Sequence, residues 1–295
     1  MEARLKPRGS DRLWVLLFLI PSLFGVALGG VGSSAVSILL SFTDWNNVSP
    51  PHWVGLANYI ASLKDSQFLE AVSTTLRFTI VYVPLCLVTA LSAALLLNRR
   101  LPGQGFFRAA FFFPSLTSAV AVALVFSWIY AKDGGLLNRA LGLVGIPPIT
   151  WMGSKTIFWA VTIANVWGAV GEGMIVFLAA LQAVPSLYYE AARIDGAGSL
   201  RRFFKITLPL ISPAIFFQIV IYTVNALQAF EYIYMLARRQ QGASEMTTAV
   251  YLIYRNGFRW FNMGLASTEA VLLALVIVIF MVLYFRAEKR FVYYE

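Results

Sequence analysis

The sequence predicts an all-α membrane protein with six transmembrane helices, and three observations support this fold class. Hydrophobic residues make up 59% of the 295 residues and charged residues only 13%, whereas soluble domains contain about 45–50% apolar and about 25% charged residues. Six apolar runs are each long enough to cross a bilayer as a helix, which takes about 20 residues. None of these runs alternates between apolar and polar positions, as the strands of a transmembrane β-barrel do.

The six runs should be helical because a helix satisfies its own backbone hydrogen bonds in lipid. The predicted crossings cover residues 13–42, 71–97, 106–130, 157–181, 208–236 and 265–285. We expect residues 13–285 to form one transmembrane domain, flanked by cytoplasmic termini at 1–12 and 286–295. The first run contains Pro21 and several glycines, so it should be kinked or only partly in lipid.

Lysine and arginine predict the orientation. With the N-terminus inside, these residues are about twice as dense in the inner segments as in the outer ones, which places both termini in the cytoplasm. Arg238 and Arg239 lie on the outer side and count against this orientation. The net charge of +9 then reflects topology and contact with anionic lipid rather than nucleic acid. A single cysteine, Cys86, and a single histidine, His52, argue against a metal site.

The segment between the fourth and fifth crossings is predicted to be a cytoplasmic helical hairpin. Ser186 is a candidate N-cap for a helix over 187–194, and Gly196 and Gly198 allow a turn after it. Ser199 can cap the next stretch, and a proline at 209 opens the fifth crossing. The charged and apolar side chains of this hairpin suit docking to a partner protein. The alternative is a hairpin that lies on the lipid headgroups.

The hairpin also carries a motif: Glu190-Ala-Ala-x-x-Asp-Gly-Ala, then Phe203 or Phe204, then Ile206-x-Leu-Pro209. This motif resembles the conserved cytoplasmic loop of binding-protein-dependent ABC importer permeases. Weaker segments resemble the carbohydrate-uptake branch, which contains sugar and glycerol-3-phosphate permeases. These segments are Ser41-Phe-Thr-Asp-Trp-Asn with Val54-Gly-Leu-Ala-Asn-Tyr59, and Phe107-Arg-Ala-Ala-Phe-Phe-Phe-Pro114. With Tyr254-Arg-x-Gly-Phe258 before the last crossing, the resemblance to the permeases spans nearly the whole chain.

The resemblance implies a multi-pass protein of the prokaryotic plasma (inner) membrane with several partners. A second homologous permease, two cytoplasmic ATPase subunits and an extracytoplasmic solute-binding protein would complete the importer within the lipid bilayer. The ATPase-coupling loop would consist of Glu190, Ala191, Ala192, Arg193, Asp195, Gly196, Ala197 and Gly198. The chain contains no Gly-x-x-x-x-Gly-Lys-Ser/Thr phosphate loop. We therefore expect no enzyme activity and no cofactor here, with ATP and magnesium bound by the partner subunits.

Polar residues inside the fourth and fifth runs are candidates for the substrate path, because charge within a bilayer is costly. Glu172 lies near the middle of the fourth run, and Asn165 lies two turns earlier on the same face. Four residues of the fifth run recur at three-residue steps: Tyr222, Asn225, Gln228 and Glu231. Carboxylates, amides and aromatic rings suit a hydroxyl-rich solute. The alternative is that these groups only join helix to helix.

The resemblance adds to this reading, since Asn165, Glu172, Asn225 and Gln228 look like the sugar-contacting positions of carbohydrate permeases. Arg77, Glu231 and Glu269 lie near the outer ends of their runs. We expect Arg77 to form a structural ion pair with one of these acids, unless it only reaches to the outer interface.

The predicted function is the permease subunit of an ATP-driven, binding-protein-dependent importer for a carbohydrate or related polyol, working by alternating access. The acidic Glu172 favours a neutral or amino sugar over a phosphorylated solute, and a glycerol-3-phosphate importer is the alternative within the class. Outside the class, a proton-coupled secondary transporter would use Glu172 as its proton carrier.

Overall fold

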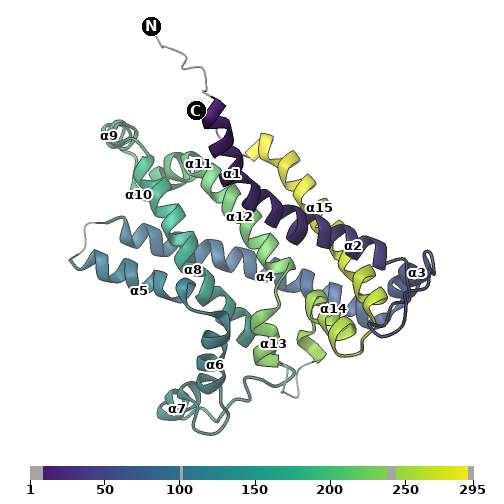
Figure 1. Cartoon of the computed structure of the whole chain (residues 1–295). Helices are drawn as coiled ribbons and strands as arrows, with labels where there is room; N and C mark the ends of the chain where they lie inside the picture. Colours follow the sequence, from purple (N-terminus) through teal and green to yellow (C-terminus); the bar gives the residue numbers. More distant parts are fainter. Residues whose placement is uncertain (1–8, 100–101, 238–243, 292–295) are drawn as a thin grey trace. The chain divides into compact units, whose positions relative to one another are not determined.

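The computed structural model describes residues 9–99, 102–237 and 244–291, which form helices joined by short loops (Figure 1). Within these ranges no β-strand occurs apart from an isolated antiparallel bridge between Thr43 and Trp53. The fold class predicted from composition and apolar runs is confirmed. Most of the predicted cytoplasmic N-terminus, and the outer arginines Arg238 and Arg239, lie outside the described residues.

The chain forms two compact units rather than the single body expected for residues 13–285. Unit 1 comprises Met1–Lys64 and Ile253–Leu272, and unit 2 comprises Asp65–Leu252 and Leu273–Glu295. The division falls inside the last long helix, which contributes residues to both units. The bounds of the predicted transmembrane domain therefore remain a prediction.

Unit 1 begins with a long apolar helix in three consecutive segments, α1 (Gly9–Gly25), the π-helical η1 (Val26–Gly32) and α2 (Ser33–Leu40). The irregularity expected in this run takes the form of η1, where the Ser33 hydroxyl donates to the carbonyl of Gly29 at 2.5 Å. Unit 1 continues with α3 (Ala57–Lys64), most of α14 (Ala249–Phe258) and the first part of α15 (Met263–Phe291).

Unit 2 contains the remaining helices. They are α4 (Ser66–Leu97), α5 (Gln104–Leu116), α6 (Ala119–Ile129), α7 (Leu136–Leu143), α8 (Ile157–Ala183), α9 (Ser186–Ile194), α10 (Ser199–Arg202), η2 (Phe203–Thr207), α11 (Leu208–Leu210), α12 (Ser212–Leu227), α13 (Glu231–Ala237) and η3 (Ser244–Met246). Helix α8 packs along α4 and against α5, and α12 packs against α4. Cys86 lies in this core with no exposed surface, as a small apolar residue would.

Among the described residues, five helices are long and apolar enough to cross a membrane: Trp14–Leu40, Ser66–Leu97, Ile157–Ala183, Ser212–Leu236 and Met263–Lys289. The predicted third crossing, residues 106–130, is not one straight helix. It forms α5 and α6, which are bent by 102° at a short break. Pro114 lies just before the break, where its missing N–H and its ring disfavour a continuous helix.

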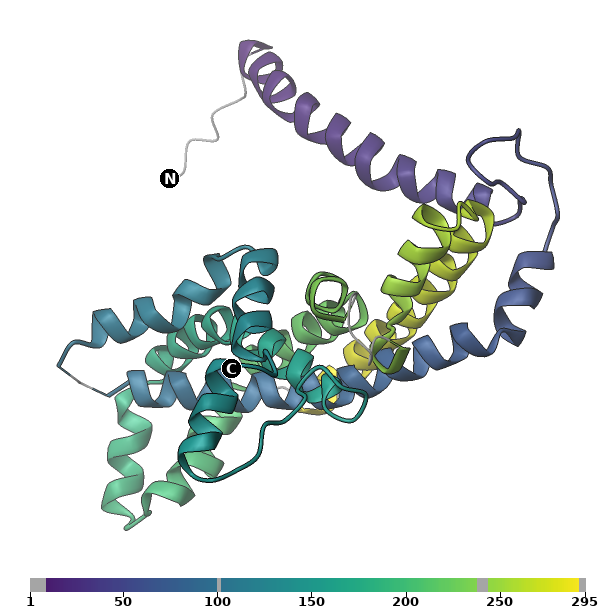
Figure 2. The ribbon, with the colours of Figure 1, turned by 90° about the horizontal axis from the view of Figure 1, so that it is seen from below.

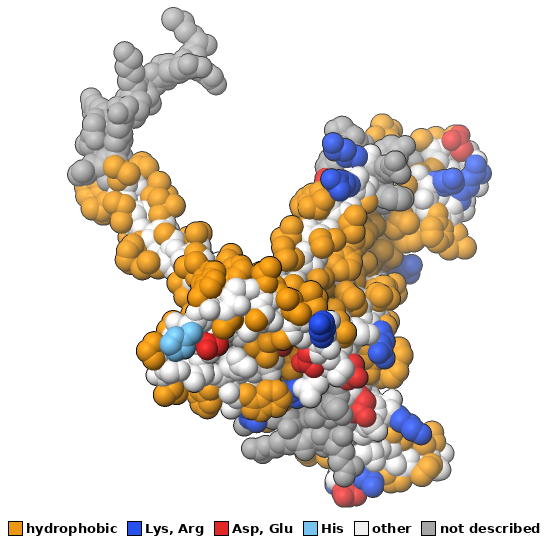
Figure 3. Space-filling view, turned by 90° about the vertical axis from the view of Figure 1, so that its right-hand side faces the viewer, with side chains coloured by type: hydrophobic (Ala, Val, Ile, Leu, Met, Phe, Trp, Pro, Cys, Tyr) orange, Lys and Arg blue, Asp and Glu red, His pale blue; other side chains and the backbone are white. Residues whose placement is uncertain are grey.

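Apolar side chains cover most of the face seen in Figure 3, with charged side chains gathered at a few places. Such a surface is normal for helices that contact lipid, and costly for a protein surrounded by water. The apolar window of the segment Trp14–Leu40 contains no buried residue.

Two of the sequence segments noted above fold together in unit 1 as a set of hydrogen bonds that we call the polar clasp, formed by Ser41, Thr43, Asn58, Tyr59 and Thr268. The Asn58 amide donates to the carbonyls of Ser41 and Thr43 at 3.1 and 2.7 Å. The Ser41 and Tyr59 hydroxyls lie 2.7 Å apart, and the Thr268 hydroxyl donates to the carbonyl of Ser41 at 2.9 Å. The clasp ties the end of the first crossing to α15.

Candidate functional site

A cavity of about 500 Å³ lies in unit 2 among α4, α5, α6, α8, α12 and α13. This volume falls in the usual range for small-molecule sites. The described residues that line it are mostly polar. They are Tyr82, Pro114, Ser115, Thr117, Ala119, Asn165, Gly168, Ala169, Glu172, Asn225, Gln228, Ala229, Phe230, Glu231 and Tyr232.

Two helix interruptions border the cavity. The break between α5 and α6 contributes Thr117, and the break between α12 and α13 contributes Gln228, while Ser115 and Glu231 lie on the adjoining helix ends. Non-helical backbone at membrane depth is tolerated where it faces protein or a water-filled cavity. Interrupted helices of this kind border the solute sites of many transporters.

Four of the five residues predicted for the substrate path line this one cavity: Asn165, Glu172, Asn225 and Gln228. The fifth, Tyr222, does not line it. Its side chain is 1% exposed and packs in the core, where its ring lies edge-on to Tyr82 with the ring centroids 6.2 Å apart. The three-residue step along the fifth run places Tyr222 on a neighbouring, buried part of the helix surface.

Glycines of α8 let other helices approach closely on either side of Glu172. A β-carbon at Gly168 would overlap the Tyr232 hydroxyl, and one at Gly173 would overlap the Tyr222 hydroxyl. At Gly171 the backbone of α5 occupies the space that a side chain would need. The glycines noted around Glu172 in the sequence therefore serve close packing, which fixes the carboxylate-bearing turn of α8 beside the cavity.

The polar side chains of the cavity fall into two groups by their hydrogen bonds. Ser115 donates to the carbonyl of Phe112 at 2.7 Å, and Thr117 donates to that of Phe113 at 3.0 Å. Asn165 donates its amide to the carbonyl of Val161 at 2.9 Å. In the part of the chain that the structure describes, the side chains of the second group have no hydrogen-bond partner. That group comprises Glu172, Asn225, Gln228 and Glu231.

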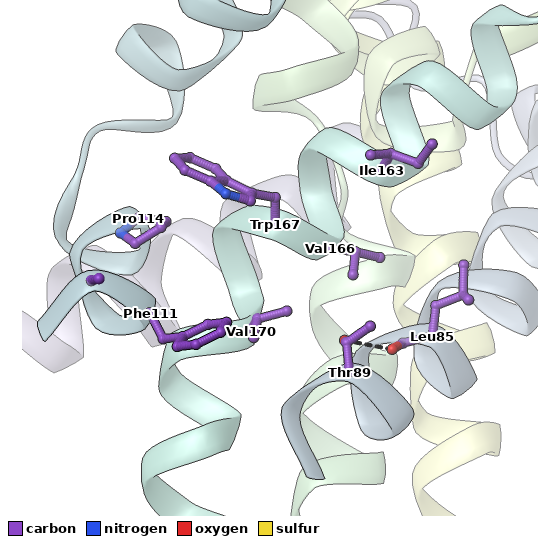
Figure 4. A pocket seen from close by; sticks show the side chains of 9 residues that line it. Leu85, Thr89, Phe111, Pro114, Ile163, Val166, Trp167 and Val170 are labelled. Atoms are coloured by element: carbon purple, nitrogen blue, oxygen red, sulfur yellow. Dashed lines mark hydrogen bonds between the residues drawn. The ribbon is translucent and has the colours of Figure 1, made fainter. Parts of the chain in front are cut away.

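A second cavity of about 520 Å³ lies among α4, α5 and α8 and shares Pro114 with the first. Its wall is apolar, with Phe111, Trp167 and Val170 facing it (Figure 4). The hydroxyl of Thr89 is already bonded to the carbonyl of Leu85 at 2.6 Å. The two cavities are similar in size, so their chemistry separates them: among the described residues, the first is lined by carboxylates and side-chain amides and the second is not.

The structure does not show the predicted ion pair. Arg77 is exposed on α4, and the described residues include no hydrogen bond or ion pair between it and Glu231, which faces the cavity instead. Glu269 lies in unit 1 with no exposed surface, and both its carboxylate oxygens accept from the amide of Asn256, at 2.7 and 2.8 Å. Sequence position alone gave no sign of this partner.

The predicted cytoplasmic hairpin is present as α9 and α10, and it stands apart at one end of unit 2 in both ribbon views (Figures 1 and 2). Gly196 has a φ of +72°, which explains a glycine at the turn. The caps differ by one residue from the prediction. Pro185 and Gly198 hold the N-cap positions, and Ser186 and Ser199 are the first helical residues.

No residue of α9 is buried, so the helix is accessible on all sides in this chain. A hydrogen bond of 2.9 Å between the hydroxyls of Tyr189 and Thr207 connects it to η2. A hollow of about 200 Å³ is lined by residues of the predicted coupling loop and by basic side chains of α10 and η2. Its lining residues are Ala192, Asp195, Ala197, Arg201, Arg202, Lys205 and Ile206. The hairpin therefore offers a largely uncovered surface of mixed apolar and charged character, as a docking element would.

Comparison with known protein families identifies the kind of transporter to which the chain belongs. Residues 87–293, which include the cavity-bearing helices from α5 onward and the hairpin, match the family described as the binding-protein-dependent transport system inner membrane component. The chain belongs to this family. As the inner membrane component of an ABC importer it is a multi-pass permease subunit without ATPase activity or a cofactor of its own. Membership overturns the alternative of a stand-alone proton-coupled transporter.

Characterised relatives cover nearly the whole permease. The probable ABC transporter permease protein YesP of Bacillus subtilis is 33% identical over 97% of this chain and 93% of its own length. The trehalose/maltose transport system permease protein MalF of Thermococcus litoralis is 32% identical over 94% and 92%. The sulfoquinovosyl glycerol transport system permease protein SmoG of Agrobacterium fabrum is 33% identical over 89% and 86%.

The fold of the permease is also found in solved structures. It is similar, with a TM-score of 0.82 and 22% identity, to a chain of a bacterial alginate ABC transporter in complex with an alginate pentasaccharide-bound periplasmic protein. That match covers 95% of this chain and 96% of the other. Permeases of this family work in complexes with a binding protein and ATPase subunits.

Proposed function

We propose that this permease carries a carbohydrate or related polyol through the polar cavity of unit 2, by alternating access driven by ATPase partners. The observation that carries the proposal is the meeting of Asn165, Glu172, Asn225 and Gln228 at one cavity of about 500 Å³. Free carboxylates and amides beside the ring of Tyr232 supply the hydrogen bonds and the flat apolar surface that sugars require.

The relatives support the solute class. The names of four relatives state what their systems transport. These solutes are trehalose and maltose, starch degradation products, sulfoquinovosyl glycerol and sn-glycerol-3-phosphate. All of these are carbohydrates or polyol derivatives. A glycerol-3-phosphate importer was the alternative within the class, and one such permease, from Yersinia pestis, is 32% identical over 82% of this chain.

The partner set proposed for this permease has four parts: a second homologous permease, two cytoplasmic ATPase subunits and an extracytoplasmic solute-binding protein. The two permeases would enclose the cavity, whose residues Glu172, Asn225, Gln228 and Glu231 are exposed in this chain alone. The loop from Glu190 to Gly198 would seat in an ATPase subunit. Movement of α9 would reach the membrane through α8 and through the Tyr189–Thr207 bond, which leads to α11 and α12.

The coupling role is tested by Glu190→Arg in the complete transporter reconstituted in lipid vesicles. Glu190 is exposed on α9, and a bulky cation there should disturb the docking surface without unfolding the chain. We expect ATP hydrolysis to lose its stimulation by the loaded binding protein, and uptake to fall with it. Glu190→Gln, which keeps the side-chain volume, separates loss of charge from steric conflict. Normal coupled uptake by Glu190→Arg would refute the role of the loop.

The role of the cavity is tested by Glu172→Ala, measured as ATP-dependent uptake of a panel of labelled solutes: trehalose, maltose, glucosamine and glycerol 3-phosphate. The variant should assemble normally, since the Glu172 side chain has no hydrogen-bond partner in the described residues. We expect its uptake rate or its preference within the panel to change. An unchanged profile would remove Glu172 from the substrate path, and uptake of no carbohydrate by the unmodified transporter would refute the solute class.

A further inference from the structure

Five of the polar side chains that line the cavity present hydrogen-bond acceptors, alongside the amides of Asn225 and Gln228, which can both donate and accept. A hydroxyl has one hydrogen to donate, and Ser115 and Thr117 have given theirs to the carbonyls of Phe112 and Phe113. Toward the cavity, these two hydroxyls can therefore only accept hydrogen bonds. Because their partners are main-chain carbonyls, which only accept, the direction of both bonds is fixed.

The orientation of the Asn165 side chain is also fixed by its hydrogen bond to a main-chain carbonyl. The carbonyl of Val161 can only accept, so the amide nitrogen of Asn165 must face it, and the carbonyl oxygen of the side chain is left for the cavity. Two carboxylates, Glu172 and Glu231, line the same wall and are acceptors only when ionised. Five lining side chains thus present acceptor oxygens to one space.

The cavity wall carries negative charge in addition to its acceptor oxygens. Glu172 and Glu231 are both exposed, so water in the cavity can solvate the two carboxylates. Among the described residues that line the cavity there is no lysine or arginine to balance them. A cleft lined by charges of one sign concentrates ions of the opposite sign and repels ions of its own, by about 10- to 1000-fold in local concentration or rate.

From these contacts we propose that the cavity is an acceptor-rich, anion-rejecting filter in which Glu231 acts together with Glu172. Its solute then donates hydrogen bonds through hydroxyl or ammonium groups and carries no phosphate, sulfonate or carboxylate. The identity of the solute as a carbohydrate rests on the proposed function, but the electrostatic character of the cavity does not. Glu231, expected from the sequence to pair with Arg77, becomes a specificity-determining residue.

The proposal is tested by thiol labelling of Ser115→Cys in the assembled, full-length transporter. Serine and cysteine are similar in size, and the position lines the cavity. Native Cys86 is fully buried, so the unmodified chain serves as the blank. The probes are a cationic, a neutral and an anionic methanethiosulfonate, and each rate is divided by the rate of the same reagent with free 2-mercaptoethanol.

We expect the cationic reagent to react at least tenfold faster than the anionic one after this correction. Glu172→Gln and Glu231→Gln should each reduce the ratio, and the double variant should bring it near one. Glu70→Gln, at an exposed glutamate of α4 that does not line the cavity, is the control and should leave the ratio unchanged.

Two results would overturn the proposal. One is a ratio of cationic to anionic labelling rates near one in the Ser115→Cys protein, or a ratio that stays high in the Glu172→Gln, Glu231→Gln double variant. The other is ATP-driven uptake of glycerol 3-phosphate by the unmodified transporter. Labelling needs no transport, so its outcome is independent of the proposed function. A high ratio in a transporter that carries no carbohydrate would refute the proposed function while leaving the filter in place.

Discussion

The polar clasp of unit 1 and the cavity of unit 2 are built from the same kinds of side chain and use them in opposite ways. In the clasp, Asn58 donates two hydrogen bonds to main-chain carbonyls, and nearby in unit 1 the buried Glu269 accepts two from Asn256. In the cavity, Asn225 and Glu172 have no partner among the described residues and are exposed. Open hydrogen-bonding groups therefore distinguish Asn225 and Glu172 from the amides and carboxylates that join segments of unit 1.

The largest loss of stability is expected for Asn256→Leu. Leucine cannot donate, so the buried carboxylate of Glu269 would lose two hydrogen bonds, at a cost of about 3 kcal/mol. The measurement is the midpoint of thermal unfolding of the purified transporter complex, which should fall by several degrees. Asn225→Leu is the matched control, because it removes an amide that has no described partner. Equal thermal midpoints for Asn256→Leu and Asn225→Leu would contradict the contrast between bonded and unbonded amides.

A smaller loss is expected for Gly173→Ala, in the packing that supports the cavity. The new methyl group would overlap the hydroxyl of Tyr222, and such overpacking costs about 2 kcal/mol. Gly105→Ala, in α5, is the control, since nothing lies within 4 Å of a β-carbon at that position. The same thermal measurement should show a lower midpoint for Gly173→Ala only. If both variants were unaffected, the close approach at Gly173 would not constrain the structure.

Asn58→Ala should cost slightly less, about 1.5 kcal/mol, for the two hydrogen bonds that the clasp would lose. Uptake per assembled complex should be unchanged, because unit 1 contributes no residue to the lining of the cavity. Vesicle uptake normalised to the amount of intact complex checks this. Reduced uptake at full assembly would show that the clasp does more than hold the loop.

The smallest effect on stability, within about 0.5 kcal/mol, is expected for Asn225→Ala and Gln228→Ala. Uptake should nevertheless fall about fivefold in each, since a hydrogen bond to the solute is worth about 1 kcal/mol. The thermal midpoint and vesicle uptake are measured on the same preparations. The comparison fails if stability falls while uptake stays normal, because these amides would then serve structure, as Asn58 does.

Much of this architecture could be predicted from the sequence, because run length and helical spacing act locally. The spacing of seven between Asn165 and Glu172, and of three between Asn225 and Gln228, placed all four at one cavity. Breaks in helices were harder to predict. Pro114 preceded the α5–α6 bend, but the break after Leu227 contains neither glycine nor proline, so nothing local marked it.

The partners of buried polar groups could not be predicted at all, because they depend on contacts between segments that are distant in the chain. Thr268 donates to the carbonyl of Ser41 across 227 positions. The place of Glu231 near the outer end of a run made it one of two candidate partners for Arg77, whereas in the structure it begins α13 and lines the cavity. Tyr222 followed the right periodicity but lies in the core.

The uncovered helix Trp14–Leu40 has a consequence for how the protein is made. All its faces are apolar and exposed, so once synthesised it cannot remain in water while later segments emerge from the ribosome. It has to enter the bilayer during translation, before any of unit 2 exists to pack against. Its insertion therefore depends on its own apolar composition, and a single charge placed near the middle of this helix would impair delivery to the membrane before it affected transport.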